Sequence, residues 1–371
     1  MRVAILGTRG IPARYGGFET LAEELAARLA TRGHEVSVFT RKSSAVPGVT
    51  RHRGAQVKVL PALRFKHLET LSHTFLSALA ATRRDHDVVL LCNAANAPFI
   101  PLLHARGLPV ALNVDGLERF RRKWGRVASS YYHLCERLSA RWADAVITDA
   151  EVIESYYRER WGRPSIMIPY GGDLEAPTGT ATLERLGLAD GEYLLYVSRF
   201  EPENNPDRVI AAYRNVPGKI PLVLVGGAPY AARLSRTVTS LAGADPRVLL
   251  TGPIYGEGYR ELLFHARAYI HATEVGGTHP ALVEAMGAAR VIFFLDNPAN
   301  REVVGDAGVP FVFDGPGDLT AALTPFVTGG DVHRPLAEAA RRKIDERYRW
   351  EHVAAAYERV LEGLCCENRR A

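Results

Sequence analysis

Long uncharged hydrophobic runs are missing from this sequence. The most apolar stretch, residues 88–114, is interrupted by Asn93 and Asn96, by prolines, and by His104 and Arg106. A membrane-spanning helix needs about 20 predominantly apolar residues, so this stretch is not expected to cross a bilayer. Met1–Leu6 lead straight into a glycine turn, which indicates a first strand and not a signal peptide.

Cysteine is scarce and irregularly placed. The chain has four cysteines, Cys92, Cys135, Cys365 and Cys366. They have neither the paired spacing of a zinc site nor the density of a disulfide scaffold. A reducing, cytoplasmic location is therefore expected. Low-complexity tracts and internal repeats are also missing. With 371 residues, 47% apolar and 23% charged, the composition is that of a folded protein, and the length favours two domains.

Charge is unevenly distributed between the two halves of the chain. Residues 1–170 hold 25 Lys and Arg against 15 Asp and Glu, a balance of +10; the rest hold 46 − 25 = 21 against 41 − 15 = 26, a balance of −5. Charge alone favours drift in surface composition as the explanation. The alternative is a basic half that faces an anionic membrane or a lipid-diphosphate acceptor, with Arg119–Arg126 as the contact and Phe120 and Trp124 as interfacial anchors. No nucleic-acid module is recognisable, so no nucleic-acid partner is expected.

Short apolar runs alternate with amphipathic helical patterns along the whole chain, which predicts parallel α/β sheets. The expected strands of the first half are 3–6, 35–40, 56–60, 87–92, 110–114 and 145–148. Those of the second half are 193–197, 222–225, 248–250, 268–271, 291–295 and 310–313. Helices are expected at 18–31, 68–84, 127–143, 336–346 and 350–364. The hinge is placed at Ile168–Asp173 and the polar segment after it.

The segment from Gly276 to Met286 carries the clearest functional signal. A Gly-Gly-Thr turn and Pro280 open onto a helical pattern that contains Glu284. The start of a helix offers free backbone N–H groups and partial positive charge to a phosphate. Glu284, one turn further, is placed to accept hydrogen bonds from sugar hydroxyls. These features together predict a nucleotide-sugar pocket.

This segment resembles the signature of family-4 retaining glycosyltransferases, which is a Glu, seven residues and a second Glu before Ala-Met. Glu284 matches the second Glu, and Gly276 stands where the first would be. A bacterial rhamnosyltransferase-like branch of the family lacks the first Glu in the same way and has a similar Gly-Gly-Thr-Asn-Pro segment. Glu274 is either a replacement for it or the end of a loop. His271 and His279 either touch the donor or have no function.

The resemblance implies the GT-B fold: two Rossmann-like α/β domains whose parallel sheets face each other across a cleft. It assigns residues 1–170 to the acceptor and 171–348 to the nucleotide-sugar. Residues 349–371 would be a helix that crosses back onto the first domain. An ordinary terminal helix of the second domain is the alternative that periodicity leaves open.

The turn after the first strand contains several glycines but not the Gly-x-Gly-x-x-Gly spacing of a dinucleotide fold. Gly16 and Gly17 match the family's glycine pair, whose amides face the donor diphosphate or the acceptor. Tyr15, beside them, is an acceptor-side candidate. The surrounding Gly-Thr-Arg-Gly-Ile-Pro and Tyr-Gly-Gly-Phe-Glu-Thr segments resemble the rhamnosyltransferase-like branch.

Two further positions take their roles from the resemblance. Arg199 matches the family's diphosphate-binding Arg, whereas Asn204 stands in place of the usual Lys, so Arg199 and helix N-termini would stabilise more of the leaving charge. Without the family resemblance, Arg199 would be interpreted as a surface residue that pairs with Glu201. Asp115 ends an apolar strand where the family keeps a His or Asp beside the reacting sugar, although it also suits a turn. Glu118 is a second acceptor-side candidate.

The sequence therefore predicts a retaining glycosyltransferase whose catalytic residues are Asp115 and Arg199. The donor-binding residues are expected to be Gly16, Gly17, Arg199, Asn204, Gly276, Gly277, Thr278 and Glu284. No cofactor or metal is expected, because the acidic motif Asp85–Asp87 suits a strand cap. The resemblance points to dTDP-rhamnose as donor, with UDP- and GDP-sugars behind it, and to a saccharide or lipid-linked saccharide as acceptor, in surface polysaccharide synthesis. A UDP-sugar 2-epimerase of the same fold and a non-catalytic nucleotide-sugar-binding protein are the alternatives.

Overall fold

The computed structural model describes the chain except for residues 15, 64, 66–67, 84–85, 123, 228–231, 330–332 and 369–371. The chain divides into two compact units. Unit 1 consists of Met1–Phe120, Trp124–Tyr170 and Trp350–Ala371, and unit 2 of Arg121–Lys123 and Gly171–Arg349. Two short pieces thus differ from the expected division, because Arg121–Lys123 and Arg349 belong to unit 2.

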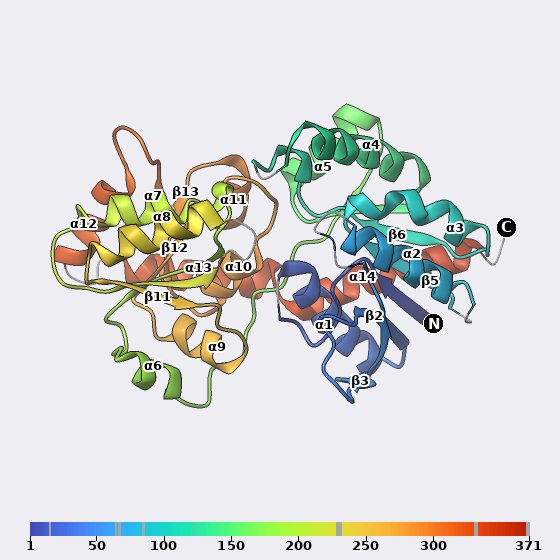
Figure 1. Ribbon diagram of the computed structural model, residues 1–371, viewed down its shortest axis with the longest axis horizontal. Helices are drawn as coiled ribbons and strands as arrows, with labels where there is room; N and C mark the ends of the chain where they lie inside the picture. The colour runs from blue at the N-terminus through green and yellow to red at the C-terminus, as the bar shows by residue number, and fades with distance from the viewer. Residues whose placement is uncertain are drawn as a thin grey trace. The chain divides into compact units, whose positions relative to one another are not determined.

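Unit 1 is built on an eight-stranded sheet in the order β3-β4-β2-β1-β5-β6-β7-β8, parallel except for the β3–β4 pair. Its strands are β1 Arg2–Leu6, β2 Glu35–Arg41, β3 Arg51–His52, β4 Ala55–Leu60, β5 Val88–Cys92, β6 Val110–Asn113, β7 Ala145–Thr148 and β8 Ile166–Met167. Its helices are α1 Gly17–Thr31, α2 Glu69–Ala81, η1 Ala94–Phe99, α3 Ile100–His104, η2 Glu118–Phe120, α4 Arg126–Trp142, α5 Glu151–Trp161 and α14 Trp350–Asn368. Figure 1 shows the sheet of this unit layered between helices.

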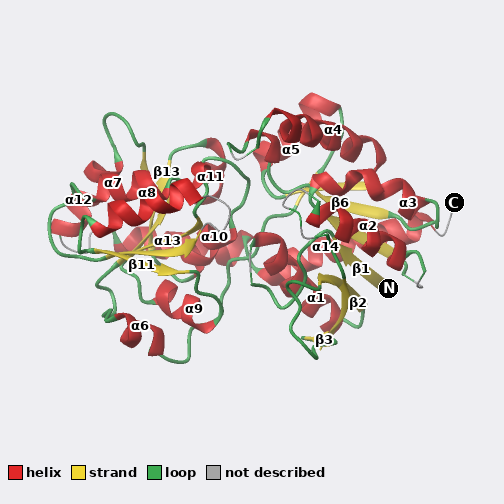
Figure 2. Cartoon of the chain, viewed as in Figure 1, coloured by secondary structure: helices red, strands yellow, loops and turns green. Residues whose placement is uncertain are grey.

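Unit 2 contains a six-stranded, fully parallel sheet in the order β11-β10-β9-β12-β13-β14. Its strands are β9 Leu194–Arg199, β10 Leu222–Gly227, β11 Val248–Gly252, β12 Ala268–His271, β13 Val291–Leu295 and β14 Val309–Phe311. Its helices are α6 Ala181–Leu186, η3 Pro202–Asn204, α7 Pro206–Tyr213, α8 Ala232–Gly243, α9 Glu257–Phe264, α10 Pro280–Gly287, α11 Pro298–Val304, α12 Leu319–Thr328 and α13 Arg334–Arg347. Figure 2 shows the strands of each unit in yellow with red helices on either side.

The central strands are buried on both faces, as expected for parallel sheets covered by helices. Every residue of β5 is buried, and so are those of β12. One apolar cluster fills unit 1 and includes Leu6, Leu91 and Leu112. A separate cluster fills unit 2 and includes Tyr196, Leu224 and Phe293. Each unit therefore has a core of its own, and the loops at the carboxyl ends of its strands are left to carry function.

All twelve strands expected from the alternating pattern are present. The pattern did not predict β3 and β8, because a strand of two residues leaves no periodicity to detect. Helix α2 ends at Ala81, earlier than predicted, and Arg84 lies outside the described residues. The pattern also left out α5 and most helices of unit 2, whose short apolar stripes are hard to separate from loops.

The last helix, α14, belongs to unit 1. It packs on α1 and reaches β5 and β6. Trp350, Tyr357 and Leu361 are buried along its inner side. In the part of the chain that the structure describes, neither this helix nor any other combines the length and the apolar character needed to cross a bilayer.

Candidate functional site

The predicted donor residues of unit 2 lie at the carboxyl edge of its sheet. Arg199 is the last residue of β9, and β12, its neighbour in the sheet, ends at His271. The chain then passes through Gly276 to the start of α10 at Pro280. Neighbouring parallel strands end at one edge, so segments far apart in the sequence meet there.

Glu284 is held inside unit 2 by a tyrosine that the sequence did not single out. Its side chain is only 7% exposed, and the hydroxyl of Tyr259 on α9 donates a 2.6 Å hydrogen bond to its Oε2. Burial, followed by the charge of Glu284, raises the pKa of Tyr259 well above its ordinary value. The phenol therefore stays protonated as a donor and orients the carboxylate. No local motif marks Tyr259, because the contact joins two different helices.

Position 276 has no room for the missing signature Glu. Gly276 has a φ of 143°, and a Cβ added there would lie 2.4 Å from Cε1 of His279. His279 immediately precedes α10 and is half-buried. The ring of His271 lies 4.9 Å from that of His279, measured between centroids. The space beside the Gly-Gly-Thr turn is therefore occupied by imidazole.

Both imidazoles are uncharged at neutral pH. Burial lowers the pKa of His271 to about 3. Burial also lowers the pKa of His279 well below its ordinary value, and His271, Arg121 and Arg199 lower it further by charge. Since Arg199 acts on His279 electrostatically, it brings positive charge to the start of α10. This arrangement suits an anionic group such as a diphosphate.

Asn204, which stands where the family has a Lys, has a structural role in this chain. Its Nδ2 donates a 2.6 Å hydrogen bond to the carbonyl oxygen of Arg199, and its own carbonyl accepts one of 2.6 Å from Tyr196. The residue is buried. It therefore fixes the backbone that carries Arg199, and a direct contact of Asn204 with the donor stays a prediction.

The basic segment expected to contact a membrane is largely committed to acidic partners. Arg121 is 7% exposed, and its Nη1 lies 3.4 Å from Oε1 of the fully buried Glu203. Arg122 pairs with Glu274, whose other oxygen accepts a 3.0 Å hydrogen bond from Asn205. Arg121 is therefore not available to a lipid surface, whereas Arg122 is paired but its side chain is 52% exposed. A membrane contact of residues 119–126 stays a prediction. Lys123 lies outside the described residues.

The two anchors proposed for that membrane contact differ from each other. Phe120 is 52% exposed, and the guanidinium of Arg119 lies 4.3 Å from its ring centroid. Trp124 is half-buried, and its Nε1 donates a 3.2 Å hydrogen bond to Glu118. Glu118, an expected acceptor-side residue, is thus oriented by the indole.

The glycine loop of unit 1 is shaped by the protein itself. A Cβ at Gly7 would lie 2.2 Å from the carbonyl oxygen of Cys92, so only glycine fits there. Gly16 precedes α1 with extended backbone, and its carbonyl accepts the first hydrogen bonds of that helix. The buried Glu19 accepts a 2.8 Å hydrogen bond from the backbone N–H of Arg9 and holds the loop. Gly16 and Gly17 lie at the N-terminus of α1, as expected, and Tyr15 lies outside the described residues.

Asp115 follows β6 in a strained turn. Its φ is 56°, and its N–H donates a 2.8 Å hydrogen bond to the side chain of Asn113. The hydroxyl of Tyr170 lies 3.3 Å from Oδ1 of Asp115. Burial, then the charges of Asp115 and Asp149, raises the pKa of Tyr170 well above its ordinary value. Asp115 therefore has a protonated donor beside it, and Tyr170 is a second residue that the sequence did not single out.

The acidic motif before β5 caps the sheet. Asp87 accepts hydrogen bonds from the backbone N–H of Arg2 at 2.7 Å and from its guanidinium at 2.9 Å. Asp85 lies outside the described residues.

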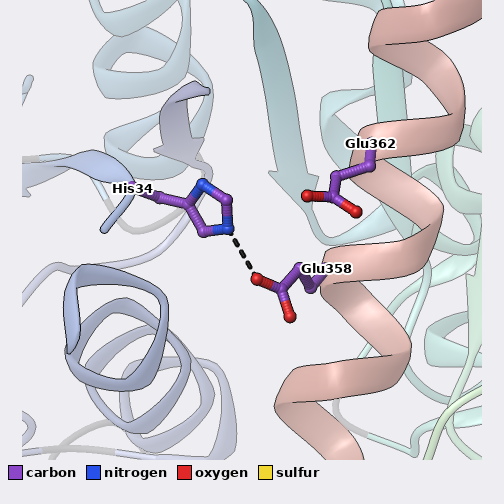
Figure 3. Close-up of side chains that lie close together, drawn as sticks. All are labelled: His34, Glu358 and Glu362. Atoms are coloured by element: carbon purple, nitrogen blue, oxygen red, sulfur yellow. Dashed lines mark hydrogen bonds and ion pairs between the residues drawn. The ribbon is translucent and has the colours of Figure 1, made fainter. Parts of the chain in front are cut away.

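Among the described residues, a group with metal-ligand geometry lies on α14 and at the start of β2. One ligand atom from each of His34, Glu358 and Glu362 lies within 4.8 Å of the others. Figure 3 shows the three side chains close together, with His34 paired to Glu358. However, Nε2 of His34 is 2.6 Å from Oε1 of Glu358, and Arg32 lies 2.6 Å from its Oε2. These pairs attach α14 to unit 1, so we give the group a structural role.

Two family models match this chain. The glycosyl transferase 4-like domain matches residues 16–171, and the glycosyl transferases group 1 domain matches residues 183–343. D-inositol 3-phosphate glycosyltransferase from Xylanimonas cellulosilytica is 27% identical over 92% of this chain and 90% of its own length. A GDP-mannose-dependent alpha-(1-6)-phosphatidylinositol monomannoside mannosyltransferase from Mycolicibacterium smegmatis is 26% identical over 67% of each chain.

Solved structures share the fold at low identity. Sucrose-phosphate synthase from Thermosynechococcus elongatus superposes with a TM-score of 0.83 at 20% identity over 99% of both chains. Alr3699/HepE from Anabaena, solved with UDP-glucose, gives 0.76 at 17% identity over 98% of this chain and 100% of its own. The two sheets, the carboxyl-edge loops and the two family models together identify the chain as a glycosyltransferase of the GT-B fold.

Proposed function

We propose that this glycosyltransferase moves a sugar, with retention of anomeric configuration, from a nucleotide-sugar bound by unit 2 to a saccharide acceptor bound by unit 1. The observation that carries the proposal is the buried Glu284–Tyr259 pair on α10 and α9, beside the Gly-Gly-Thr turn. A fixed carboxylate accepts from the ribose hydroxyls while the helix start receives phosphate. The GDP-mannose and UDP-glucose named for two similar proteins support a nucleotide-sugar donor.

The proposed reaction takes place on one face of the sugar. The bond between the anomeric carbon and the phosphate oxygen breaks, and its electron pair stays on the diphosphate. The acceptor hydroxyl forms the new bond on the same face and gives its proton to the departing phosphate oxygen. Arg199 and the backbone N–H groups at Gly277 and Thr278 stabilise the charge that develops. Asp115, with Tyr170 beside it, orients the reacting sugar, and no step uses a metal ion.

Our proposal for the donor sugar starts from the glycine at position 276. Without a carboxylate there, the usual partner of a glucose-type ring hydroxyl is missing, which favours another sugar. The Gly-Gly-Thr segment and the Glu-Pro-Glu-Asn-Asn segment resemble the rhamnosyltransferase-like branch, so dTDP-rhamnose is our first candidate. UDP- and GDP-sugars come next, and the similar mannosyltransferase supports the latter.

We place the acceptor on a lipid carrier of surface polysaccharide synthesis, at the inner face of the membrane. Helix α4 supports a membrane contact better than the 119–126 segment does. Val127 and Leu134 are 87% and 50% exposed on it, and Arg137 and Arg141 are exposed at helical spacing from them. Apolar and basic side chains on one helix face suit an anionic lipid surface.

A panel of nucleotide-sugars tests the proposal. Thermal unfolding is followed with dTDP-rhamnose, GDP-mannose, UDP-glucose, UDP-GlcNAc and the free nucleoside diphosphates, because a ligand of the folded state raises the melting temperature. One nucleotide-sugar is expected to stabilise wild type and to lose this effect in Glu284→Ala. Stabilisation by none of them would overturn the proposal.

The two alternatives predict different products. A 2-epimerase would convert the stabilising nucleotide-sugar to its epimer without an acceptor, and a binding protein would leave it unchanged with every acceptor. Transfer to a lipid-linked saccharide, followed by mass spectrometry, is the expected result.

A further inference from the structure

The ring of His279 fills the space in which a side chain at position 276 would begin. A Cβ added to Gly276 would lie 2.4 Å from Cε1 and 2.9 Å from Nε2 of His279. Such contacts leave no room for any side chain unless the imidazole moves. Glycine at 276 and histidine at 279 are therefore one packing arrangement, in which the histidine takes the place beside the turn.

The imidazole of His279 is held from the sheet side as well. The ring of His271, at the end of β12, lies 4.9 Å away with 45° between the planes. His271 in turn stacks on Tyr269, with centroids 6.3 Å apart and planes at 21°. Both Tyr269 and His271 are buried. A column of three rings thus fixes His279 before any ligand arrives, which lowers the entropic cost of a contact with a ligand.

The chemistry of this ring differs from that of a carboxylate. The depressed pKa of His279 keeps the imidazole neutral, so it has one N–H donor and one nitrogen acceptor, whereas a carboxylate only accepts. His279 immediately precedes α10, whose N-terminus is the expected phosphate site, so the ring lies near the expected diphosphate. The sugar of a nucleotide-sugar is attached to that diphosphate.

We infer that His279 is the residue that contacts the donor sugar ring in place of the signature carboxylate and selects which nucleotide-hexose is accepted. The inference rests on the proposed function. A neutral ring that both donates and accepts fits a sugar whose hydroxyl makes a single ordinary hydrogen bond. The neutral imidazole does not form the stronger, charge-assisted hydrogen bond that a carboxylate would form.

The test compares free and sugar-bearing nucleotides. Calorimetry is carried out on wild type, His279→Ala and His279→Asn with the stabilising nucleotide-sugar and with the nucleoside diphosphate alone. The Ala variant is expected to bind the nucleotide-sugar about tenfold more weakly, which corresponds to about 1.4 kcal/mol. Its affinity for the nucleoside diphosphate should change less than about twofold, and Asn should restore part of the loss. His265→Ala, which removes a histidine paired with Asp190 elsewhere in unit 2, is the matched control.

The packing part of the inference has its own measurement. Gly276→Ala should lower the melting temperature of wild type more than that of a His279→Gly background, because the clash then disappears. Equal losses in both backgrounds would show that the ring does not fill this space and would overturn the inference.

The possible failures are distinguishable. If His279→Ala weakens the binding of both ligands equally, or of neither, His279 does not contact the sugar. The inference is then wrong, whereas the proposed donor site is unaffected. If the wild-type protein binds no nucleotide-sugar, the proposed function is wrong, and so is the inference that rests on it. A variant that fails to unfold cooperatively is replaced by His279→Asn, which keeps a polar group of similar reach.

Discussion

At the scale of single residues, the proposed donor site of unit 2 depends on individual side chains. Because Glu284 is buried and accepts from Tyr259 at 2.6 Å, Glu284→Ala should weaken binding of the free nucleoside diphosphate by about 1–3 kcal/mol. Tyr259→Phe leaves the carboxylate in place but less oriented, so a smaller loss in the same direction is expected. Calorimetry with the nucleoside diphosphate measures both. Unchanged affinity in the Ala variant would remove Glu284 from the site.

Arg199 is expected to act mainly in the transition state, where the diphosphate gains charge. Its backbone is fixed by the 2.6 Å hydrogen bond from Asn204. Arg199→Ala should therefore lower kcat more than it raises KM. Arg199→Lys should rescue only part of the rate, since a single point charge replaces a planar fork. Steady-state kinetics measure both effects. Near-normal turnover of the Ala variant would show that the diphosphate binds elsewhere.

At the scale of elements, α14 is attached to unit 1 by ion pairs as well as by its buried side chains. Arg32 contacts Glu351 at 2.8 Å and Glu358 at 2.6 Å. The hydrogen bond from Arg32 lowers the pKa of Glu351; for Glu358, burial raises the pKa, but hydrogen bonds from His34 and Arg32 outweigh it. Carboxylates with a lowered folded-state pKa stabilise the protein above their unfolded pKa and lose this effect as the pH falls through the folded value.

Acid unfolding should therefore depend on this helix. Glu358→Gln is expected to cost about 1 kcal/mol at pH 7 and less at pH 3, because the wild-type carboxylate loses its charge as the pH falls through its lowered folded-state pKa. Urea unfolding at the two pH values measures the difference. An equal loss at both would show that packing alone, through residues such as Trp350 and Tyr357, attaches the helix.

Helix α4 is the element that we expect to meet a membrane. Wild type should sediment with anionic vesicles at low salt and be released as salt screens the attraction. Arg137→Ser with Arg141→Ser should abolish sedimentation and leave nucleotide binding in unit 2 unchanged. Arg122→Ser is the matched control, since Arg122 is already paired with Glu274. Equal sedimentation of wild type and the double variant would favour a soluble acceptor.

For the molecule as a whole, the stereochemistry of the product tests the proposed same-face reaction. The product is expected to keep the anomeric configuration of the donor, whether α or β, because the new bond forms on the face that the diphosphate leaves. Nuclear magnetic resonance of the purified product, from the one-bond carbon–proton coupling at the anomeric centre, distinguishes the two linkages. A product of the opposite configuration would require an inverting attack from the other face and would overturn the mechanism while leaving the glycosyltransferase assignment intact.

The sequence by itself determined that each half folds on a mainly parallel sheet, and it placed twelve of the strands. It also placed Asp115 and Arg199 at strand ends, each at the carboxyl edge of its own sheet. Those features come from local periodicity and from the turn chemistry of glycine, which each short segment carries. Tertiary structure alone decided the partners of these residues. Tyr259 meets Glu284 across two helices, His279 fills the space above Gly276, and Arg121 is neutralised by the buried Glu203. A charge or a ring gives no sign in the sequence of which distant side chain will pack against it, because that pairing depends on how the layers are assembled.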